Sequence, residues 1–450
     1  MIQTLIAKEE GKTLEFKENC RSLDRIVQTA VAFANTSGGS IVIGVKDRTK
    51  EIAGVADAVA DESRLANAFA ENIKPLFIPD IQITSWRGRS LIIVVIPHAL
   101  GPYYVRSEGP DEGVYIRLGS TNRRAGREMV AEIRRLARNT TFDEQPCPEI
   151  NSEDIDFRAA SELFSELSLS LTASKRRSLG LVVDYGGRDV PTNGAVLLFG
   201  KTRSGLFPDA TVSCARFAGT SAARFVDRSV IDEHLPKAIE SVVSFVERHT
   251  RSGAEIGRVL RRDVPEFPPE VVREAVVNAI VHADYSITGA STRVAIFDDR
   301  IEITNPGLLP FGLTMEAALS GISRLRNRVI GRTFRELHLI EQWGSGISRM
   351  REGCANAGLP PPRFEEIGTH FRVTLFGGRV TPQVERDWLK KLRVHLAKKG
   401  SISTQEAALL WGTSDRTARS RLRQLVNEGA LEELGTGPRD PRKVYLLKQA

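Results

Sequence analysis

Apolar residues recur at helix or strand spacing along most of the chain, and they divide it into four regions. In the first, residues 1–140, helical spacing over Arg25–Asn35 is followed by a Gly-rich turn and a buried strand pattern at Ser40–Val45. Leu91–Ile96 is a further apolar run of strand length. This alternation predicts an α/β domain.

A polar stretch, 140–151, contains Pro146 and Pro148 and is typical of a linker. The second region, 152–252, is predicted to be a mixed α/β connecting domain. We expect helices near Arg158–Leu167 and Leu235–Glu247, and strands near Gly194–Phe199 and Thr211–Phe217.

The third region, 253–378, combines a predicted helix at Val271–Ala283 with two strands, Thr292–Phe297 and Ile301–Thr304, around a short turn. The fourth region, 380–450, begins near Pro382 and shows short amphipathic helices followed by a hairpin pattern. The fold class predicted for the whole chain is therefore α/β multidomain.

Composition agrees with a folded, water-soluble chain. Its 450 residues are 41% hydrophobic and 26% charged, which excludes a mostly disordered protein, a collagen and a coiled-coil rod. No apolar run reaches the ~18–20 residues of a membrane span, and Met1–Lys12 lacks the apolar segment of a signal peptide. We expect a cytoplasmic protein without membrane contact. The four cysteines form no CxxC spacing, so neither a zinc site nor a disulfide framework is expected.

The positive charge is concentrated at one end. The net charge is +7, and the segment from Val380 onward holds 14 Lys/Arg against 8 Asp/Glu, an excess of +6. A small basic unit of this kind indicates a polyanionic partner, and nucleic acid is the first candidate.

Gly200-Lys201-Thr202 resembles the end of a phosphate-binding P-loop. That loop requires a glycine five positions before Gly200, where this chain has Ala195, and Gly194 is one residue too early. The intervening apolar residues predict a buried strand ending in a turn. The sequence therefore does not support a P-loop helicase motor.

The helix predicted at Val271–Ala283 carries a polar row on an apolar background. Glu274, Asn278 and His282 follow one another at four-residue steps and share one face, and Asp284 comes directly after. A carboxylate and an amide one turn apart can hold Mg²⁺ and orient a water molecule. A solvated helix face is the plainer explanation of such a row.

Downstream motifs strengthen the functional interpretation. Asn305-Pro306-Gly307 predicts an irregular turn, and Gly344 and Gly346 would let backbone approach a phosphate closely. Residues 273–376 resemble the GHKL-type ATPase domain, in the divergent branch joined to Schlafen-like domains. The matching stretches are REAVVNAIVHADYS, IFDDRIEITNPGLLP, SRLRN and HLIEQWGSGISRM.

This resemblance implies a GHKL-like α/β sandwich that binds ATP and Mg²⁺. Glu274 would activate the hydrolytic water, and Asn278 would coordinate Mg²⁺. The remaining residues of the implied nucleotide site are His282, Asp284, Asn305, Gly307, Gly344 and Gly346. Asn305 stands where the family has an adenine-reading Asp, and Leu308 replaces the usual second glycine after Gly307, so ATP hydrolysis is left open.

The first region resembles the Schlafen-like Alba-type domain. The matching motifs are EGKTLEFKE at 10–18, AFANTSGGSIVIGVKD at 32–47 and YIRLGSTNRRA at 115–125. The resemblance implies nucleic-acid binding. We expect phosphate contacts from Arg123, Arg124 and Arg127, with Arg117 beside them and a basic helix face at Arg134, Arg135 and Arg138.

Some members of the wider family are ribonucleases that use three carboxylates. Glu10, Glu15 and Asp47 stand at matching positions, and clustered carboxylates could bind a divalent metal for phosphodiester cleavage. Glu15 and Lys17 alternate along a predicted strand and share a face. A simple Glu15–Lys17 ion pair is the structural alternative.

The last region resembles winged-helix transcription regulators. Ser403 and Glu406 predict a capping box, and Ser414 would cap the following helix. The candidate groove-contacting residues of that helix are Arg416, Thr417, Arg419, Ser420 and Arg423, and the candidate wing residues are Arg439, Arg442 and Lys443.

Together these features favour an ATP-binding, DNA-binding protein, a transcriptional regulator whose DNA contacts respond to nucleotide. Double-stranded DNA is the favoured partner, RNA is a second candidate, and homo-oligomerisation is left open. The alternatives are a Schlafen-type metal-dependent nuclease gated by ATP, and a scaffold with an inactive nucleotide fold.

Overall fold

The computed structural model describes residues 2–47, 49–250, 252–256, 261–341, 345–378, 391–392, 395–396, 399–427, 431–434 and 444–447. The chain forms two compact units, Met1–Gly378 and Arg379–Ala450. No helix within these described ranges is long and apolar enough to cross a membrane.

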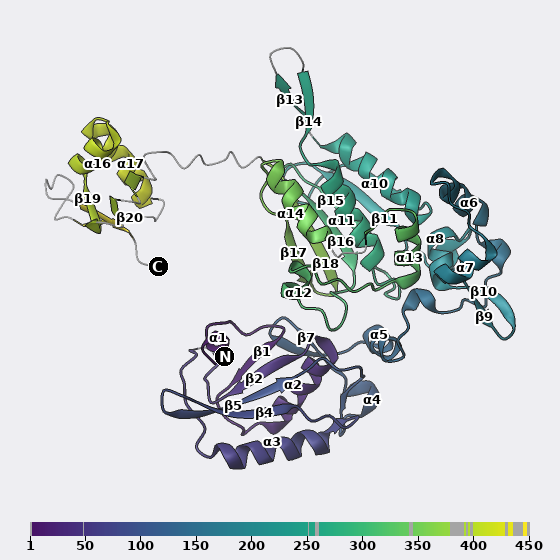
Figure 1. Cartoon of the computed structure of the whole chain (residues 1–450), viewed down its shortest axis with the longest axis horizontal. Helices are drawn as coiled ribbons and strands as arrows, with labels where there is room; N and C mark the ends of the chain where they lie inside the picture. Colours follow the sequence, from purple (N-terminus) through teal and green to yellow (C-terminus); the bar gives the residue numbers. More distant parts are fainter. Residues whose placement is uncertain are drawn as a thin grey trace. The chain divides into compact units, whose positions relative to one another are not determined.

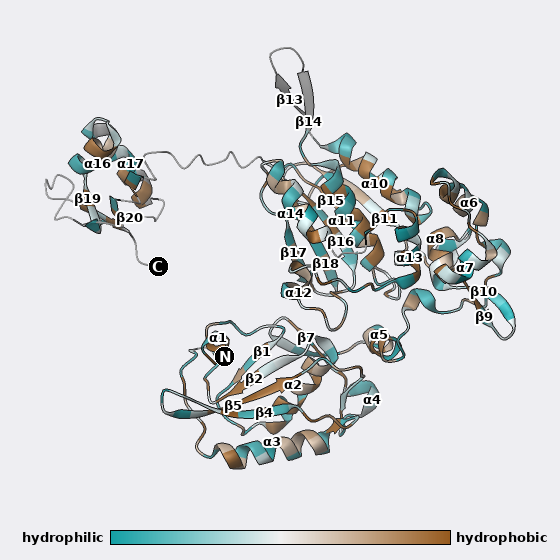
Figure 2. Cartoon of the chain, viewed as in Figure 1, coloured by the Kyte–Doolittle hydropathy of each residue, from teal (hydrophilic) through white to brown (hydrophobic). Residues whose placement is uncertain are grey.

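The N-terminal part is built around a four-stranded sheet in the order β1-β2-β5-β4. Its strands are Leu14–Lys17, Gly39–Ile43, Arg89–Ile96 and Asp80–Trp86, in the same order. Helix α2 (Leu23–Thr36) packs on the sheet with Phe33 fully buried. Helix α3 (Ala58–Asn72) covers the same core, and it alternates between hydrophobic and hydrophilic colours because only one of its sides is buried (Figure 2).

Short elements complete this part. They are α1 (Ile2–Ile6), β3 (Ile73–Lys74), β6 (Tyr104–Val105), α4 (Gly109–Glu112), β7 (Tyr115–Leu118), β8 (Thr121–Arg124) and α5 (Arg127–Ala137). The hairpin of β7 and β8 contains most of the expected phosphate-contacting arginines.

A six-stranded sheet in the order β12-β11-β15-β16-β18-β17 forms the second core. Its strands are Phe225–Ile231, Val212–Phe217, Thr292–Ile296, Arg300–Pro306, His370–Phe376 and Arg363–Ile367, in the same order. Helices α10 (Leu235–His249), α11 (Pro269–His282) and α14 (Gly346–Asn356) lie across one face of it (Figure 1). The sheet takes strands from both of the regions expected as 152–252 and 253–378, because β11 pairs in parallel with β15.

The connecting elements form a small helical group beside this sheet. They are α6 (Phe157–Glu166), α7 (Ala173–Leu179), β9 (Val182–Tyr185), β10 (Arg188–Pro191), α8 (Asn193–Phe199) and α9 (Arg203–Leu206). The strand expected at Gly194–Phe199 was wrong, since this run is helix α8. Thr192 caps the helix by accepting from the Ala195 N–H, and every residue from Gly194 to Phe199 is buried. A run that is apolar on all sides carries no periodicity to distinguish helix from strand.

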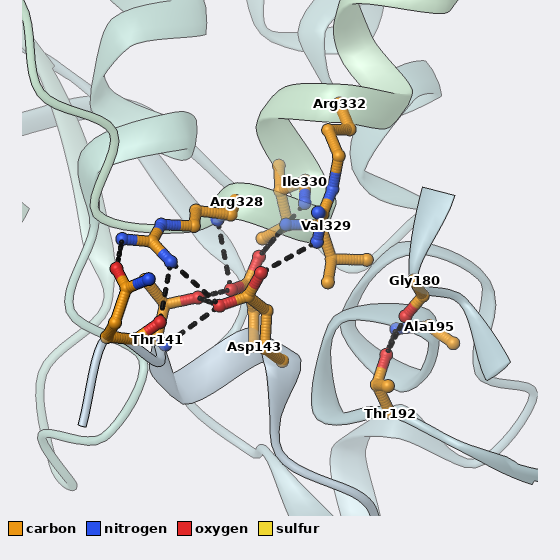
Figure 3. A network of polar contacts seen from close by, with 11 residues as sticks. Thr141, Asp143, Gly180, Thr192, Ala195, Arg328, Val329, Ile330 and Arg332 are labelled. Carbon is orange, nitrogen blue, oxygen red and sulfur yellow. Dashed lines mark hydrogen bonds and ion pairs between the residues drawn. The ribbon is translucent and has the colours of Figure 1, made fainter. Parts of the chain in front are cut away.

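The remaining elements before residue 378 are the 3-10 turns η1 (Phe142–Glu144) and η2 (Ser152–Asp154), the hairpin β13 (Ser252–Ile256) and β14 (Arg261–Pro265), and helices α12 (Met315–Leu319) and α13 (Arg328–Glu336). The buried carboxylate of Asp143 caps the N-terminus of helix α13 (Figure 3). Asp143 accepts from the backbone N–H groups of Arg328, Val329 and Ile330 at 3.0, 2.7 and 3.0 Å. These donors have no partner inside the helix, so a side chain distant in sequence serves as the cap.

The second unit contains β19 (Ser401–Ser403), α16 (Thr404–Trp411), α17 (Asp415–Asn427), β20 (Leu431–Leu434) and β21 (Val444–Leu447). Its three strands pair in the order β19-β21-β20. The capping box predicted at Ser403 and Glu406 is confirmed, and Gly412 ends α16 in the left-handed conformation. Leu422 and Leu425 of α17 pack into a separate small core.

Candidate nucleotide site

Helix α11 is buried on most of its surface because it lies between α10, α14 and the sheet. Its polar row is therefore not a solvated face. Asn278 donates from Nδ2 to Glu274 Oε1 at 2.9 Å, so the two residues predicted to act together are in direct contact. The two side chains therefore share one face of α11, as their four-residue spacing predicts.

Helix α14 supplies a partner for Glu274 that the sequence pattern did not suggest. Arg349 donates from Nη2 to Glu274 Oε2 at 2.7 Å, and its Nη1 lies 2.5 Å from Glu341 Oε2. Gly346 lies against the same carboxylate, where a Cβ would collide with Glu274 and lie 3.0 Å from Asn278 Nδ2. The two helices approach closely at this point, and a larger residue here would displace the end of the Glu274 side chain.

A pocket of about 120 Å³ opens beside Asn278, between α11, α14 and the sheet. Most of its wall is apolar. Its apolar lining includes Ala279, Leu309, Ile347, Met350, Phe371 and Val373. Asn278, His282 and Asn305 add polar atoms at intervals, as expected of a small-molecule site that fixes orientation with a few groups.

His282 is the most unusual group in this pocket. Burial lowers its pKa to about 4, with Arg326 contributing, so the imidazole is neutral at pH 7. Its Nδ1 atom is buried and has no hydrogen-bond partner among the described residues. A neutral imidazole offers one donor and one acceptor, so one hydrogen-bonding position of His282 is unfilled among the described residues.

Asn305 lies at the end of β16, is buried, and donates from Nδ2 to the Pro306 carbonyl at 3.0 Å. Gly307 follows with φ +95°, and a Cβ there would lie 2.9 Å from Asp284 Cβ. Asp284 does not line the pocket; it accepts from the backbone N–H and the hydroxyl of Ser286 at 3.1 and 2.6 Å. The structure thus brings Asn278, His282, Asn305 and Gly346 to one pocket, while Gly307 and Asp284 shape the turn behind it.

Glu274 faces a second, more polar cavity of about 220 Å³ next to this pocket. The other residues that line it are Glu270, Val271, Arg273, His338, Leu339, Ile340, Glu341 and Arg349. Gly344, which we expected at the phosphates, lies outside the described residues. No group of three or more His, Cys, Asp or Glu that could hold a metal occurs in the described part of the chain.

The segment from Leu308 to Arg324 forms one wall of the pocket beside Asn278. Leu308, Leu309 and Pro310 line it at one end, and Ile322 to Arg324 line it at the other. The segment also touches the N-terminal sheet domain. Gly312 donates its N–H to the Thr36 carbonyl at 2.6 Å, and Phe311 packs into a core cluster with residues of β7 and α5.

A buried charge cluster joins the same two parts. Arg326 forms an ion pair with Glu132 of α5, lies 3.5 Å from Asp284, and donates to the Leu308 carbonyl at 2.6 Å. Burial raises the pKa of Glu132 to about 7 even with Arg326 beside it. Arg135, expected on a basic outer face, instead points inward and donates to the Ser286 hydroxyl at 3.3 Å.

Two parts of the chain match known protein families.

Residues 289–375 match the family model described as the C-terminal part of a putative ATP-dependent DNA helicase recG. Residues 10–126 match the model described as Schlafen, AlbA_2. The second match covers all three N-terminal motifs. The first covers the later motifs of the third region but begins after REAVVNAIVHADYS at 273–286, which holds Glu274, Asn278 and His282. No curated protein matches the chain.

Two solved structures are similar. One is the crystal structure of the DIP2311 protein from Corynebacterium diphtheriae, at 20% identity and a TM-score of 0.44, covering 99% of this chain and 96% of that one. The other is the solution structure of the N-terminal domain of a putative ATP-dependent DNA helicase RecG-related protein from Nitrosomonas europaea. It is 25% identical with a TM-score of 0.23, and covers 28% of this chain and 90% of that one.

The three N-terminal carboxylates lie near one another. Burial, together with the carboxylates of Asp47 and Glu15, raises the pKa of Glu10 to about 7. Glu15, however, forms ion pairs with both Lys17 and the buried Arg117. The predicted Glu15–Lys17 pair is therefore present, and two cations already neutralise the carboxylate that a metal would need.

The expected phosphate-contacting arginines differ in their surroundings. Arg123 and Arg127 are exposed. Arg124 is also exposed but contacts Glu108 at 2.8 Å and Glu112 at 3.4 Å. Arg117 is buried and bonds to the Gly11 carbonyl, so its expected place beside the phosphate contacts was wrong.

Helix α17 of the second unit presents a polar side. Arg419, Ser420 and Arg423 are exposed, and Thr417 donates its N–H to Ser414 Oγ at 3.3 Å, so Ser414 is the predicted cap. The wing candidates Arg439, Arg442 and Lys443, and the side chain of Arg416, lie outside what the structure describes.

Proposed function

We propose that this protein binds ATP with Mg²⁺ and binds DNA, and that it acts as a regulator whose nucleic-acid contacts respond to the nucleotide. The observation that carries the proposal is the Leu308–Arg324 segment. One side of it walls the nucleotide pocket and the other contacts the N-terminal sheet domain. A ligand that binds one conformation of this segment better than another therefore also changes the surface that the segment shares with the N-terminal sheet domain.

The residues present fit a purine nucleotide in a GHKL-like sandwich. An apolar slot suits the base, and the neutral His282 and Asn305 offer hydrogen bonds to its edge. Bound Mg²⁺ would neutralise triphosphate charge, and Asn278 would supply its protein oxygen ligand. The family match to a helicase-named C-terminal domain supports this assignment without implying a motor, because the sequence has no P-loop.

Two regions would contact nucleic acid. Arg123 and Arg127 of the Schlafen-like domain are exposed and would meet phosphates. The C-terminal unit has a capped helix pair followed by paired strands, the order of a winged helix, and α17 would enter the major groove through Arg416, Thr417, Arg419, Ser420 and Arg423. Arg439, Arg442 and Lys443 would contact the DNA backbone. Double-stranded DNA is the favoured partner.

Thermal melting with ATP, ADP and Mg²⁺ tests the nucleotide site. A ligand at 100 times its Kd adds about 2.7 kcal/mol to stability. We expect a rise in Tm with magnesium-ATP in the wild type and none in Asn278→Ala. No rise in either protein would contradict the proposal and favour a scaffold with an inactive nucleotide fold. A positive result is followed by measuring duplex-DNA affinity with and without ATP.

A metal-dependent nuclease is the second candidate, because Glu10, Glu15 and Asp47 lie close together. The pairing of Glu15 with Lys17 and Arg117 argues against it. Incubation of labelled RNA and DNA with Mg²⁺ or Mn²⁺ decides the matter. Cleavage that is lost in Glu15→Ala and retained in a control with the exposed Glu51→Ala would support the nuclease.

A further inference from the structure

The six-stranded sheet has two different faces. Successive side chains of a strand point to opposite faces. Val294 and Ile296 of β15 belong to the core beneath α10, α11 and α14, which lie in front of the sheet in Figure 1. Arg293 and Ala295 alternate with them and belong to the opposite face, which we call the open face. Arg293 is exposed there.

Cross-strand pairing arranges the open-face side chains in rows. One row runs Val230, Ser213, Arg293, Thr304, Arg372, Glu365, and the next runs Arg228, Ala215, Ala295, Glu302, Thr374, Arg363. Thr304 and Thr374 are buried within these rows, whereas Arg228, Val230 and Arg293, toward β12, are exposed. Neighbouring strands lie about 4.8 Å apart, so the rows extend roughly 24 Å from β12 to β17.

Positive charge exceeds negative charge on this face. Glu302 is shared by Arg300 and Arg372, at 2.7 and 3.2 Å. Arg228 and Arg293 have no side-chain hydrogen bond or ion pair with any other described residue.

The acids at the margin of the open face are already engaged. Asp299 pairs with Arg300 at 2.8 Å, and Asp298 with Arg216 at 2.5 Å. Asp227, next to Arg228 in sequence, turns to the helix side and contacts His249 of α10 at 2.8 Å. The excess of positive charge therefore remains at Arg228 and Arg293.

Three phenylalanines form a stack at the edge of the same face. The rings of Phe217 and Phe297 are stacked at 5.2 Å between centroids, and Phe225 lies 4.6 Å from Phe217. The Arg300 guanidinium lies 4.0 Å from the Phe297 centroid. None of the three rings belongs to the main core cluster, and Phe225 is 55% exposed, which leaves the end of the stack open to solvent.

We propose that the open face binds single-stranded nucleic acid, with a base stacked on Phe225 and phosphates contacted by Arg228 and Arg293. Exposed aromatic rings beside arginines are the features that bind unpaired strands, because every base has a face that can stack. A duplex keeps its bases stacked internally and cannot use Phe225 in this way. Self-association of two open faces is disfavoured, because it would bring two arginine-rich surfaces together. The surface is additional to the nucleic-acid contacts proposed for the two terminal regions.

The test uses the full chain and fluorescence anisotropy with a labelled oligo-dT and, separately, an oligo-U strand across a salt series. Each lost phosphate contact reduces the slope of log K against log salt by about 0.7 for single strands. We expect Arg228→Ala/Arg293→Ala to reduce the slope by about 1.4, and Phe225→Ala to weaken binding by roughly 5- to 150-fold. Arg158→Ala, which removes an exposed arginine from α6, is the matched control and should change neither.

A local readout separates this surface from the terminal regions. A 5-bromouridine-containing strand should crosslink, on irradiation, to the peptide carrying residues 225–230, and the Phe225→Ala variant should lose that crosslink. The proposal would be overturned if folded variants kept the wild-type salt slope and strand affinity. It would also be overturned if the strand crosslinked only to other peptides. Sedimentation showing that Phe225→Ala only converts a dimer to a monomer, with strand affinity unchanged, would overturn it as well.

Discussion

Arg349 of α14 donates to Glu274 of α11 at 2.7 Å, so the carboxylate expected to activate water is held by a guanidinium. A carboxylate engaged in this way is a poorer acceptor for a proton from water. The side chains are partly exposed, so the pair contributes little to stability but decides what Glu274 can contact.

The first prediction follows from that pair. Replacing Arg349 with methionine frees Glu274, and we expect phosphate release from ATP to increase relative to wild type. Arg351→Met, at an exposed position of the same helix, should leave the rate unchanged. A rate that falls in Arg349→Met would instead assign Arg349 to nucleotide binding, and an unchanged rate would show that the pair does not limit turnover.

Gly346 provides a steric test of the same contact. A methyl group at this position forces the Glu274 carboxylate to move, so Gly346→Ala should cost only about 1 kcal/mol of unfolding free energy but remove the ATP-induced rise in Tm. Gly205→Ala is the control, because a Cβ there meets nothing within 4 Å and alanine favours helix α9. Denaturant unfolding measures the stability of both variants against the wild type. A Gly346→Ala protein as stable as the wild type would show that α11 and α14 accommodate the methyl group at no cost.

Asp143 shows how a buried cap fixes a helix far away in sequence. Its carboxylate accepts three backbone N–H groups of α13, and Thr141 donates to it as well (Figure 3). Asp143→Asn places the side-chain amide N–H groups against the backbone N–H groups of α13. We expect this to lower the free energy of unfolding by about 2–3 kcal/mol. Asp156→Asn, at a more exposed cap, should cost no more than about 1 kcal/mol. Urea titrations measure both, and equal losses would contradict the special role of Asp143.

Local patterns predicted the elements better than they predicted what each side chain contacts. The four-residue spacing of Glu274 and Asn278 correctly placed both side chains on one face, since helix geometry alone determines it, and the two are in contact. The same reasoning could not find Arg349, whose approach to Glu274 depends on how two helices pack.

Charge patterning failed for a related reason. Arg117 was expected beside phosphate contacts and Arg135 on a basic helix face, but each lies near an acid from a distant segment, Glu15 in one case and Asp284 in the other. A sequence gives the residue type and its local element, while burial of a charge depends on a partner brought near only by the tertiary fold.

His282 predicts an acid-sensitive component of stability. Its pKa is lowered to about 4 in the folded protein from 6.5, so the unfolded chain binds the proton more readily. The stability that neutral His282 contributes to the folded protein is fully present above pH 6.5. About 3 kcal/mol of it is lost in total as the pH falls from 6.5 toward 4. The buried carboxylates with raised pKa values act in the opposite direction, so the difference between wild type and His282→Gln must be followed. That difference should change with pH only between 6.5 and 4, and a constant difference would contradict the assignment.

Arg326 provides the sharpest test of the connection between the nucleotide pocket and the N-terminal sheet domain. Arg326→Met leaves Glu132 buried without its partner, and we expect a loss of about 3 kcal/mol at pH 8. The loss should shrink at pH 6, because Glu132, whose pKa is already raised to about 7, can then take up a proton.

The double variant Arg326→Met/Glu132→Leu removes both charges, and Asp284 keeps its two hydrogen bonds from Ser286. Most of the stability should therefore return, while the effect of ATP on DNA affinity should not, because the ionic link between the pocket wall and α5 is gone. Full recovery of that effect would show that the apolar packing of Phe311 carries the coupling by itself. If the double variant instead lost as much stability as the two single variants together, a direct Arg326–Glu132 interaction would be contradicted.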